Sequence, residues 1–252
     1  TVVLVGHAPS WTDQAAAGFH AYAANRGLGA CQDCHGQDLA GGATGSACGQ
    51  CHDTTTPSFV SWKVRCTMCH GGVDDQSGAP PEATWGNADD AVRTGAHAAH
   101  VRASAIAPAF DCGACHVKPP DALASAHVDP GPAEVTFGGP AVIGSTPAWD
   151  RAAGTCASTY CHGSAAKGGS NPGPTWTRVG QGEAACGACH ALPPPAPHPA
   201  VSADRTGCRT CHDLTMDAAG ALIAPGAGGK HLDGTVQSGF HPAAWMDPAG
   251  EG

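Results

Sequence analysis

The chain has 252 residues, of which 13% are charged and 5% aromatic, whereas 36 are glycine and 21 are proline. Such a composition supplies few large apolar side chains to offset the entropy lost on ordering, so something else must fill the core. The net charge of −9 argues against a nucleic-acid-binding protein, and the apolar run 2–6 is too short to span a membrane.

Fourteen cysteines fall into seven pairs, each followed directly by a histidine, and these motifs suggest three modules, 1–63, 64–150 and 151–252. In the first module, residues 10–13 read Ser-Trp-Thr-Asp and resemble a capping box, which predicts a helix over 12–25 that presents His20. The segment Thr1–Val5 is expected to be either an edge strand or an arm that reaches a neighbour.

The second module contains a predicted helix, Asp89–Ser104, which places His97 and His100 three residues apart on one face. Two imidazoles one turn apart can bind two adjacent metal centres, although a chance pair in an alanine-rich segment stays open as an alternative. The β-like segments Glu134–Phe137 and Ala141–Ile143, bounded by glycine and proline, predict a small hairpin.

The third module holds three motifs and a proline-rich stretch, Pro193–Pro199, which predicts a stiff, extended connector that contains His198. The tail from Gly220 is rich in glycine and alanine, so we expect it to be ordered only where His231 and His241 bind metal centres. None of the three modules is large enough to fold alone, and we expect one continuous unit.

Six of the cysteine pairs have the spacing Cys-x-x-Cys-His, the attachment signal for c-type haem. The two thiols add to two vinyl groups of the porphyrin, and the following histidine becomes the proximal ligand of the iron. In the seventh pair four residues separate Cys156 from Cys161, but His162 still follows directly. We therefore predict seven covalent haem c groups, attached through Cys31, Cys34, Cys48, Cys51, Cys66, Cys69, Cys112, Cys115, Cys156, Cys161, Cys186, Cys189, Cys208 and Cys211. The predicted proximal ligands are His35, His52, His70, His116, His162, His190 and His212.

Seven haems would themselves form most of the core, so the expected fold is an irregular, haem-cored multihaem c-type cytochrome, mostly coil with short α-helices and little β-structure. A zinc ribbon would suit Cys186, Cys189, Cys208 and Cys211, with 18 residues between the two pairs. Zinc, thioredoxin-like and disulfide interpretations leave the histidine after every pair unexplained. Only for Cys156 and Cys161 does another role stay open.

Eight of the 15 histidines lie outside the motifs: His7, His20, His97, His100, His127, His198, His231 and His241. Seven haems need at most seven distal ligands, so we predict His/His ligation throughout, with one histidine spare that the sequence does not identify. Met216 and Met246 are the only methionines outside the motifs. Because Met/His ligation raises the potential, we expect haems of relatively low potential.

Full six-coordination favours an electron carrier over an enzyme, since a reductase needs an open iron position. The sequence contains no glycine-rich phosphate loop, nucleophile elbow or His-Glu-x-x-His motif. A multihaem reductase remains an alternative. Each haem also adds two propionates to a chain with only 12 lysines and arginines, so bound calcium or a similar cation is a further prediction.

Several stretches resemble the CxxxxCH/CxxCH-domain multihaem cytochromes of metal-reducing and related soil bacteria. The stretched motif with Thr155 and Gly163, then Pro174-Thr-Trp176, then Ala185–Pro194 carry the most specific part of this likeness. Further similar elements are Gly95–His100, His127-Val-Asp129 and His231–Gly234, so the likeness covers most of the chain from about Cys66 onward.

The resemblance implies a secreted protein, periplasmic or at the outer cell surface, that moves electrons over distance. Some multihaem cytochromes of such bacteria polymerise into filaments, called cytochrome nanowires, in which a histidine of one subunit ligates a haem of the next. We therefore expect an extracellular homopolymer in which His7 is the donated ligand; the alternative is a discrete carrier that serves redox partner proteins or an extracellular acceptor. Because the sequence begins at Thr1 without a visible signal peptide, we expect a processed product without an N-terminal lipid anchor.

Overall fold

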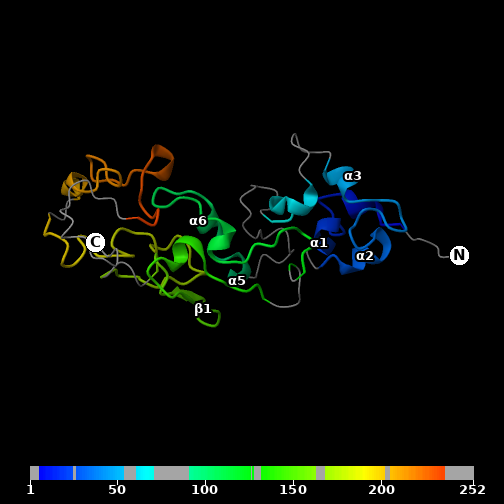
Figure 1. The fold of residues 1–252 in the computed structure, drawn as a ribbon, viewed down its shortest axis with the longest axis horizontal. Helices are drawn as coiled ribbons and strands as arrows, with labels where there is room; N and C mark the ends of the chain where they lie inside the picture. The colour runs from blue at the N-terminus through cyan, green and yellow to red at the C-terminus, as the bar shows by residue number, and fades with distance from the viewer. Residues whose placement is uncertain are drawn as a thin grey trace. The chain divides into compact units, whose positions relative to one another are not determined.

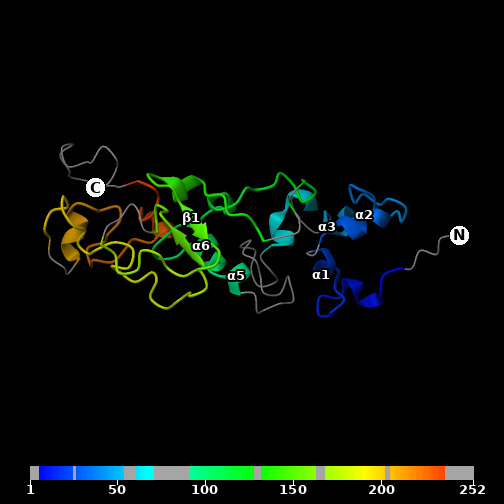
Figure 2. The same ribbon diagram turned by 90° about the horizontal axis from the view of Figure 1, so that it is seen from below.

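The computed structural model describes residues 6–24, 27–53, 61–70, 91–125, 127, 132–162, 168–201 and 205–235. Most of this ribbon is loop, with short helices and one two-stranded sheet (Figures 1 and 2). The predicted irregular fold, mostly coil with short helices and little β-structure, is thereby confirmed. Among the described helices, none is long and apolar enough to cross a bilayer.

The chain divides into two compact units. The first comprises Thr1–Thr94 and Lys118–Ala133, and the second comprises Gly95–Val117 and Glu134–Gly252. Three of the seven cysteine–histidine motifs lie in the first unit and four in the second. The three modules drawn from the sequence follow motif positions rather than contacts, and they stay a prediction.

The first unit contains a succession of short helices, whose colour in Figure 1 runs from blue through cyan to the green of α5. They are η1 (Pro9–Thr12), α1 (His20–Ala24), α2 (Gly29–His35), α3 (Gly49–His52), η2 (Trp62–Val64), η3 (Cys66–Met68) and α5 (Ala91–Thr94), where η marks a 3-10 helix. Helix α2 ends at His35 because Gly36, with φ +85°, leaves the helical path while its N–H still donates to the Gln32 carbonyl. Helix α2 therefore extends only two residues beyond the motif Cys31–His35 that it contains.

The second unit contains α6 (His97–Val101), the 3-10 helices η4 (Cys112–Ala114), η5 (Gly139–Val142), η6 (Thr206–Thr210) and η7 (Pro225–Ala227), and a small sheet. Strands β1 (Ala148–Asp150) and β2 (Thr155–Ala157) pair antiparallel, with Trp149 opposite Cys156. An isolated bridge between Thr155 and Thr175 holds a third segment against β2. This sheet therefore fixes the start of the stretched motif.

Few side chains are buried in the described part of the chain. The buried apolar residues are Leu39, Trp62, Ala107, Ala114 and Ala188, and only the first two of these are large. Leu39 is 1% exposed and lies in the loop between the first two motifs, where its carbonyl accepts from the Cys48 N–H. The polypeptide alone thus provides very little hydrophobic core, as its composition indicated.

The helix predicted over 12–25 is wrong for its first half. Thr12 ends η1, residues 13–19 form turns and bends, and within the described residues of this range only His20–Ala24 is α-helical. Of the predicted capping residues, 10–12 belong to the 3-10 helix η1, and the Asp13 carboxylate accepts from the Ala15 N–H in the turn that follows, so the capping box does not begin an α-helix. The predicted arm Thr1–Val5 lies outside the described residues.

The helix predicted over Asp89–Ser104 is present as two short helices, α5 and α6, that are interrupted at Gly95 and Ala96. Gly95 has φ +38°, outside the right-handed helical region. The helix ends at Val101, and residues 89–90 lie outside the described residues. His97 and His100 nevertheless keep their predicted spacing of one turn, because both belong to α6.

The predicted hairpin of Glu134–Phe137 with Ala141–Ile143 is wrong. The first segment pairs instead with a cysteine motif, since the Thr136 and Gly138 N–H groups donate to the carbonyls of Cys115 and Ala114. Most of the second segment belongs to η5, which Pro140 helps to start.

The proline-rich connector also departs from the prediction. Its chain turns where the His198 N–H donates to the Pro195 carbonyl, so Pro193–Pro199 is not extended throughout. The turn places His198 beside a motif of the same unit instead of along a straight spacer.

Candidate haem sites

Most of the regular motifs contain a helical turn, whereas in Cys186–His190 the chain is not helical, with Gly187 at φ +86° and His190 in a bridge to Gly168. In four of them the N–H of the histidine donates to the carbonyl of the first cysteine, at 2.9–3.0 Å, for His52, His70, His116 and His212. Residues separated by three or four positions share one face of such a turn. Both thiols and the imidazole can therefore reach one flat group, which is the physical reason for the spacing Cys-x-x-Cys-His.

The stretched motif has a different backbone. Cys156 lies in β2, and Ser158 takes a left-handed conformation with φ +53°, which bends the chain sharply. The Thr159 side chain, which is 5% exposed, accepts from the His162 N–H at 2.7 Å. The buried Thr159 hydroxyl thus accepts the His162 N–H, whereas in four regular motifs the carbonyl of the first cysteine accepts the corresponding N–H.

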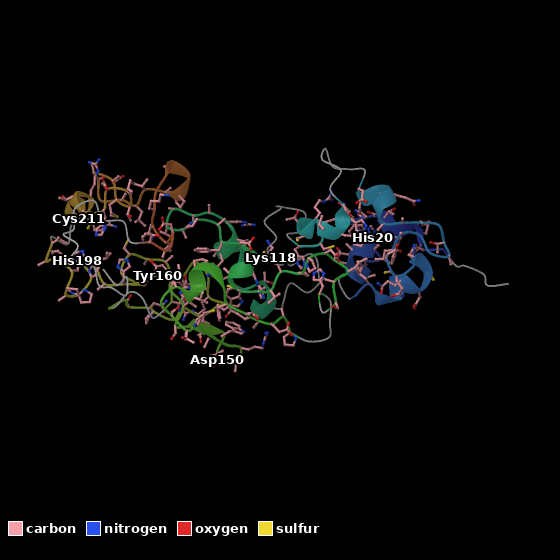
Figure 3. The ribbon with its side chains drawn as sticks, viewed as in Figure 1. His20, Lys118, Asp150, Tyr160, His198 and Cys211 are labelled. Carbon is pink, nitrogen blue, oxygen red and sulfur yellow. The ribbon has the colours of Figure 1, made fainter. Side chains whose placement is uncertain are left out.

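Each motif histidine faces one histidine from outside the motifs. In the first unit the ring centroids are 6.0 Å apart for His7–His35, 5.7 Å for His20–His52 and 6.2 Å for His70–His127. In the second unit they are 6.2 Å apart for His97–His116, 6.1 Å for His100–His162, 6.4 Å for His190–His231 and 6.2 Å for His198–His212. Figure 3 shows His198 close to Cys211, the second cysteine of the last of these motifs.

The ring separations suit a metal ion between the two rings of each pair. Metal–imidazole bonds of about 2.0–2.1 Å on opposite sides of one ion leave the ring centroids about 6 Å apart. Rings in direct stacking contact lie closer, as the 3.9 Å separation of His7 and Trp11 illustrates. The donor set therefore fits haem iron with two axial imidazoles at each of the seven motifs.

Backbone carbonyls orient many of these imidazoles. The Nδ1 atoms of eight histidines lie 2.6–3.0 Å from a carbonyl oxygen. The pairs are His20–Trp11, His35–Ser46, His100–Ala96, His116–Glu134, His127–Ala122, His190–Ala191, His198–Pro199 and His231–Ile106. Because a carbonyl only accepts, Nδ1 must carry the proton, and Nε2 keeps the lone pair that a metal needs.

Burial favours the neutral form of several of these rings. Burial first, and the nearby His100 second, lower the pKa of His162 to about 4. Burial likewise lowers the pKa of His52, His70 and His231. These imidazoles are thus deprotonated at neutral pH, which is the state that binds iron.

Burial has the opposite effect on the thiols, because their charged form is the deprotonated one. It raises the pKa of Cys156 and of Cys161 to about 11. All fourteen cysteines are described, and none forms a disulfide. In the described ranges, no three His, Cys, Asp or Glu side chains gather where they could hold a metal ion, so Cys186, Cys189, Cys208 and Cys211 do not form a zinc-ribbon cluster there. The calcium expected beside the haem propionates stays a prediction.

Two of the predicted distal ligands, His7 and His241, need separate comment. His7, expected to serve a neighbouring subunit, lies opposite His35 of its own chain. His241 lies outside the described residues, and the other seven candidates each face a different motif.

Trp176 is a neighbour of the site that the motif analysis did not single out. Its ring lies 4.7 Å from His97 at an interplanar angle of 85°, and 5.6 Å from His100. A Cβ atom on Gly95 would overlap the Trp176 indole. The glycine that interrupts the helix thus makes room for the tryptophan that packs on both ligands. Sequence offered one signal, the Pro174-Thr-Trp176 element of the resemblance.

Gly95→Ala is expected to destabilise the haem-loaded protein. The left-handed backbone alone costs about 1–3 kcal/mol for a residue with a Cβ, and the overlap with Trp176 adds to it. Chemical denaturation would measure the change in the free energy of unfolding. Gly173→Ala is the matched control, since a Cβ there meets no atom within 4 Å. Equal losses in both variants would contradict the prediction.

Comparison with known families supports the motif interpretation. Residues 155–190 match the family described as Geobacter CxxxxCH...CXXCH motif. The chain therefore carries a multihaem c-type cytochrome motif, and the resemblance inferred from the sequence is confirmed at that level. Neither the curated proteins nor the solved structures gave a match.

Proposed function

We propose that the protein is a heptahaem c-type cytochrome with two histidine ligands at every iron, and that it carries electrons without catalysing a reaction of its own. The observation that supports this most is the pairing of seven motif histidines with seven other histidines, each at a separation suited to one iron. When bound, each haem supplies a one-electron iron couple.

At each site the residues of the chain would have separate roles in holding the haem. The two cysteines hold the macrocycle, the motif histidine binds one side of the iron, and the paired histidine closes the other side. The carbonyls on Nδ1 hold the ring planes and raise the basicity of the ligand. A closed coordination sphere changes little on reduction and leaves no position for a substrate, which favours a carrier over a reductase.

Helix α6 supports transfer between neighbouring sites. His97 and His100 are three residues apart, or about 4.5 Å along the helix axis, yet they face different motif histidines, His116 and His162. Two sites that share one helical turn must be close, and short separations favour electron tunnelling.

The place of action and the assembly are also part of the proposal. The likeness of this chain to secreted cytochromes supports a periplasmic or extracellular location, where the protein would serve a redox partner protein or an external acceptor. Because His7 faces His35 within the chain, a histidine exchanged between subunits is no longer needed to complete that site. The geometry therefore favours the discrete carrier over a nanowire joined through His7.

Electron microscopy of the purified native protein, without crosslinker, separates the two forms. Particles of one size are expected for the discrete carrier. Regular filaments would show that subunits join, and a His7→Ala variant would then test whether this ligand forms the joint. Filaments that persist in the variant would mean that surface contacts hold them.

The number of haems is tested by the mass of the denatured protein. We expect seven haem increments on the chain of 24.9 kDa, because thioether bonds survive denaturation. The variant Cys156→Ala/Cys161→Ala should lose one increment and leave six. Cys208→Ala/Cys211→Ala is the matched control at a regular motif and should lose one as well. Six increments in the parent chain, unchanged in the first variant, would remove the stretched motif from the set.

A further inference from the structure

Trp11 packs on the first two ligands from outside the motifs. Its ring is stacked on His7, with centroids 3.9 Å apart and planes 2° apart. The Trp11 carbonyl accepts from His20 Nδ1 at 2.8 Å, and the two rings lie 6.0 Å apart at 37°. One residue of η1 therefore contacts both the partner of His35 and the partner of His52.

Trp176 has the same relation to two ligands in the second unit. It contacts His97 edge to face and His100 at a smaller tilt of 31°. Two contacts fix Trp176 itself. Its backbone N–H donates to the Gly154 carbonyl at 2.7 Å, and the centroid of the Trp149 ring lies 6.0 Å from that of its own ring. The two tryptophans differ in their sequence relation to the ligands: Trp11 lies between His7 and His20, whereas Trp176 follows His97 and His100 by more than 70 residues.

We propose that Trp11 and Trp176 are positioning residues, each of which holds the ring planes of two imidazoles that ligate successive haems. The inference rests on the proposed bis-histidine function and adds the residues that set ligand orientation. An indole against an imidazole restricts rotation about the bond to the metal, because turning the ring would break an aromatic contact.

The angles between paired rings give this proposal a spectroscopic signature. His7–His35 and His97–His116 are nearly parallel, at 10° and 19°. His20–His52 and His100–His162 are steeply inclined, at 56° and 67°. Each tryptophan thus contacts one ring of a parallel pair and one ring of an inclined pair. The g values of low-spin ferric haem depend on this angle, so the two kinds of pair are distinguishable by electron paramagnetic resonance.

The experiment compares Trp11→Ala and Trp176→Ala with the parent protein, all loaded with haem. Haem content from the denatured mass, the low-temperature ferric spectrum and a redox titration would be recorded. Each variant should keep all its haems and change two of the seven low-spin components, one parallel and one inclined, with a shift in the same two potentials. Trp176→Phe should restore most of the parent spectrum, since a ring still fills the space.

Trp62→Phe is the control variant. Trp62 is buried, at 6% exposure, and within the described residues its ring is not paired with a histidine ring. It should lower stability without moving individual components. Parent-like spectra in both alanine variants would overturn the proposal, as would changes spread over all seven components. Failure of the underlying function would look different: the parent protein itself would then carry fewer haems or lack low-spin bis-histidine signals.

Discussion

The chain without its haems is expected to show no cooperative unfolding transition. Ordering costs about 1–2 kcal/mol per residue in backbone entropy, whereas burying one large apolar side chain returns about 1.5–3 kcal/mol. Within the described residues only Leu39 and Trp62 are large, apolar and buried. Burial of protein side chains alone does not offset this loss of backbone entropy, so we expect the haem faces to provide most of the buried apolar surface.

This is tested by expressing the chain where no haem is attached and recording circular dichroism during heating, together with limited proteolysis. A flat melting curve and rapid cleavage throughout are expected. The haem-loaded protein is the control and should melt cooperatively and resist the protease. A sharp transition in the haem-free chain would show that the polypeptide has a core of its own.

Replacing His198 is expected to open one iron site. His198 faces His212 with centroids 6.2 Å apart, and its Nδ1 is anchored on the Pro199 carbonyl. His198→Ala should therefore convert one haem in seven to a high-spin form that binds one equivalent of carbon monoxide when reduced. His198→Met should remain low-spin and raise one potential, because a thioether ligand favours the reduced iron.

His241→Ala is the matched control, since His241 is the candidate left over after the seven pairs are formed. It should leave every haem low-spin. If His198→Ala stays fully low-spin, the double variant shows whether His241 has taken the vacant position. High-spin haem in His241→Ala alone would mean that the pairing described above is wrong at one site.

The motif residues could be predicted from sequence because their chemistry is local. In the regular motifs both thiols and the proximal imidazole lie within five consecutive residues, so spacing alone defines them. The one-turn spacing of His97 and His100 was predicted for the same reason, although Gly95 divides the longer helix that was expected.

Which distal histidine faces which motif could not be predicted, because those pairs depend on tertiary contacts. His70 meets His127, which lies 57 positions later in the chain, and His190 meets His231, which lies 41 positions later. The hairpin prediction was wrong for a related reason, because the Thr136 N–H donates to the carbonyl of Cys115, 21 residues earlier in the chain. In a chain with few regular elements, metal ligation and its anchors outweigh local β-propensity.

The hydrogen bond from His231 to the Ile106 carbonyl, 2.6 Å long, joins residues 125 positions apart. A chain is made from its N-terminus, at about 5–20 residues per second. The motifs at 112–116, 156–162 and 186–190 thus emerge well before the residue that completes the last of them. The site at His190 is therefore complete only after His231 has been made and has bonded to the Ile106 carbonyl. A chain truncated before His231 would leave that site without its second histidine.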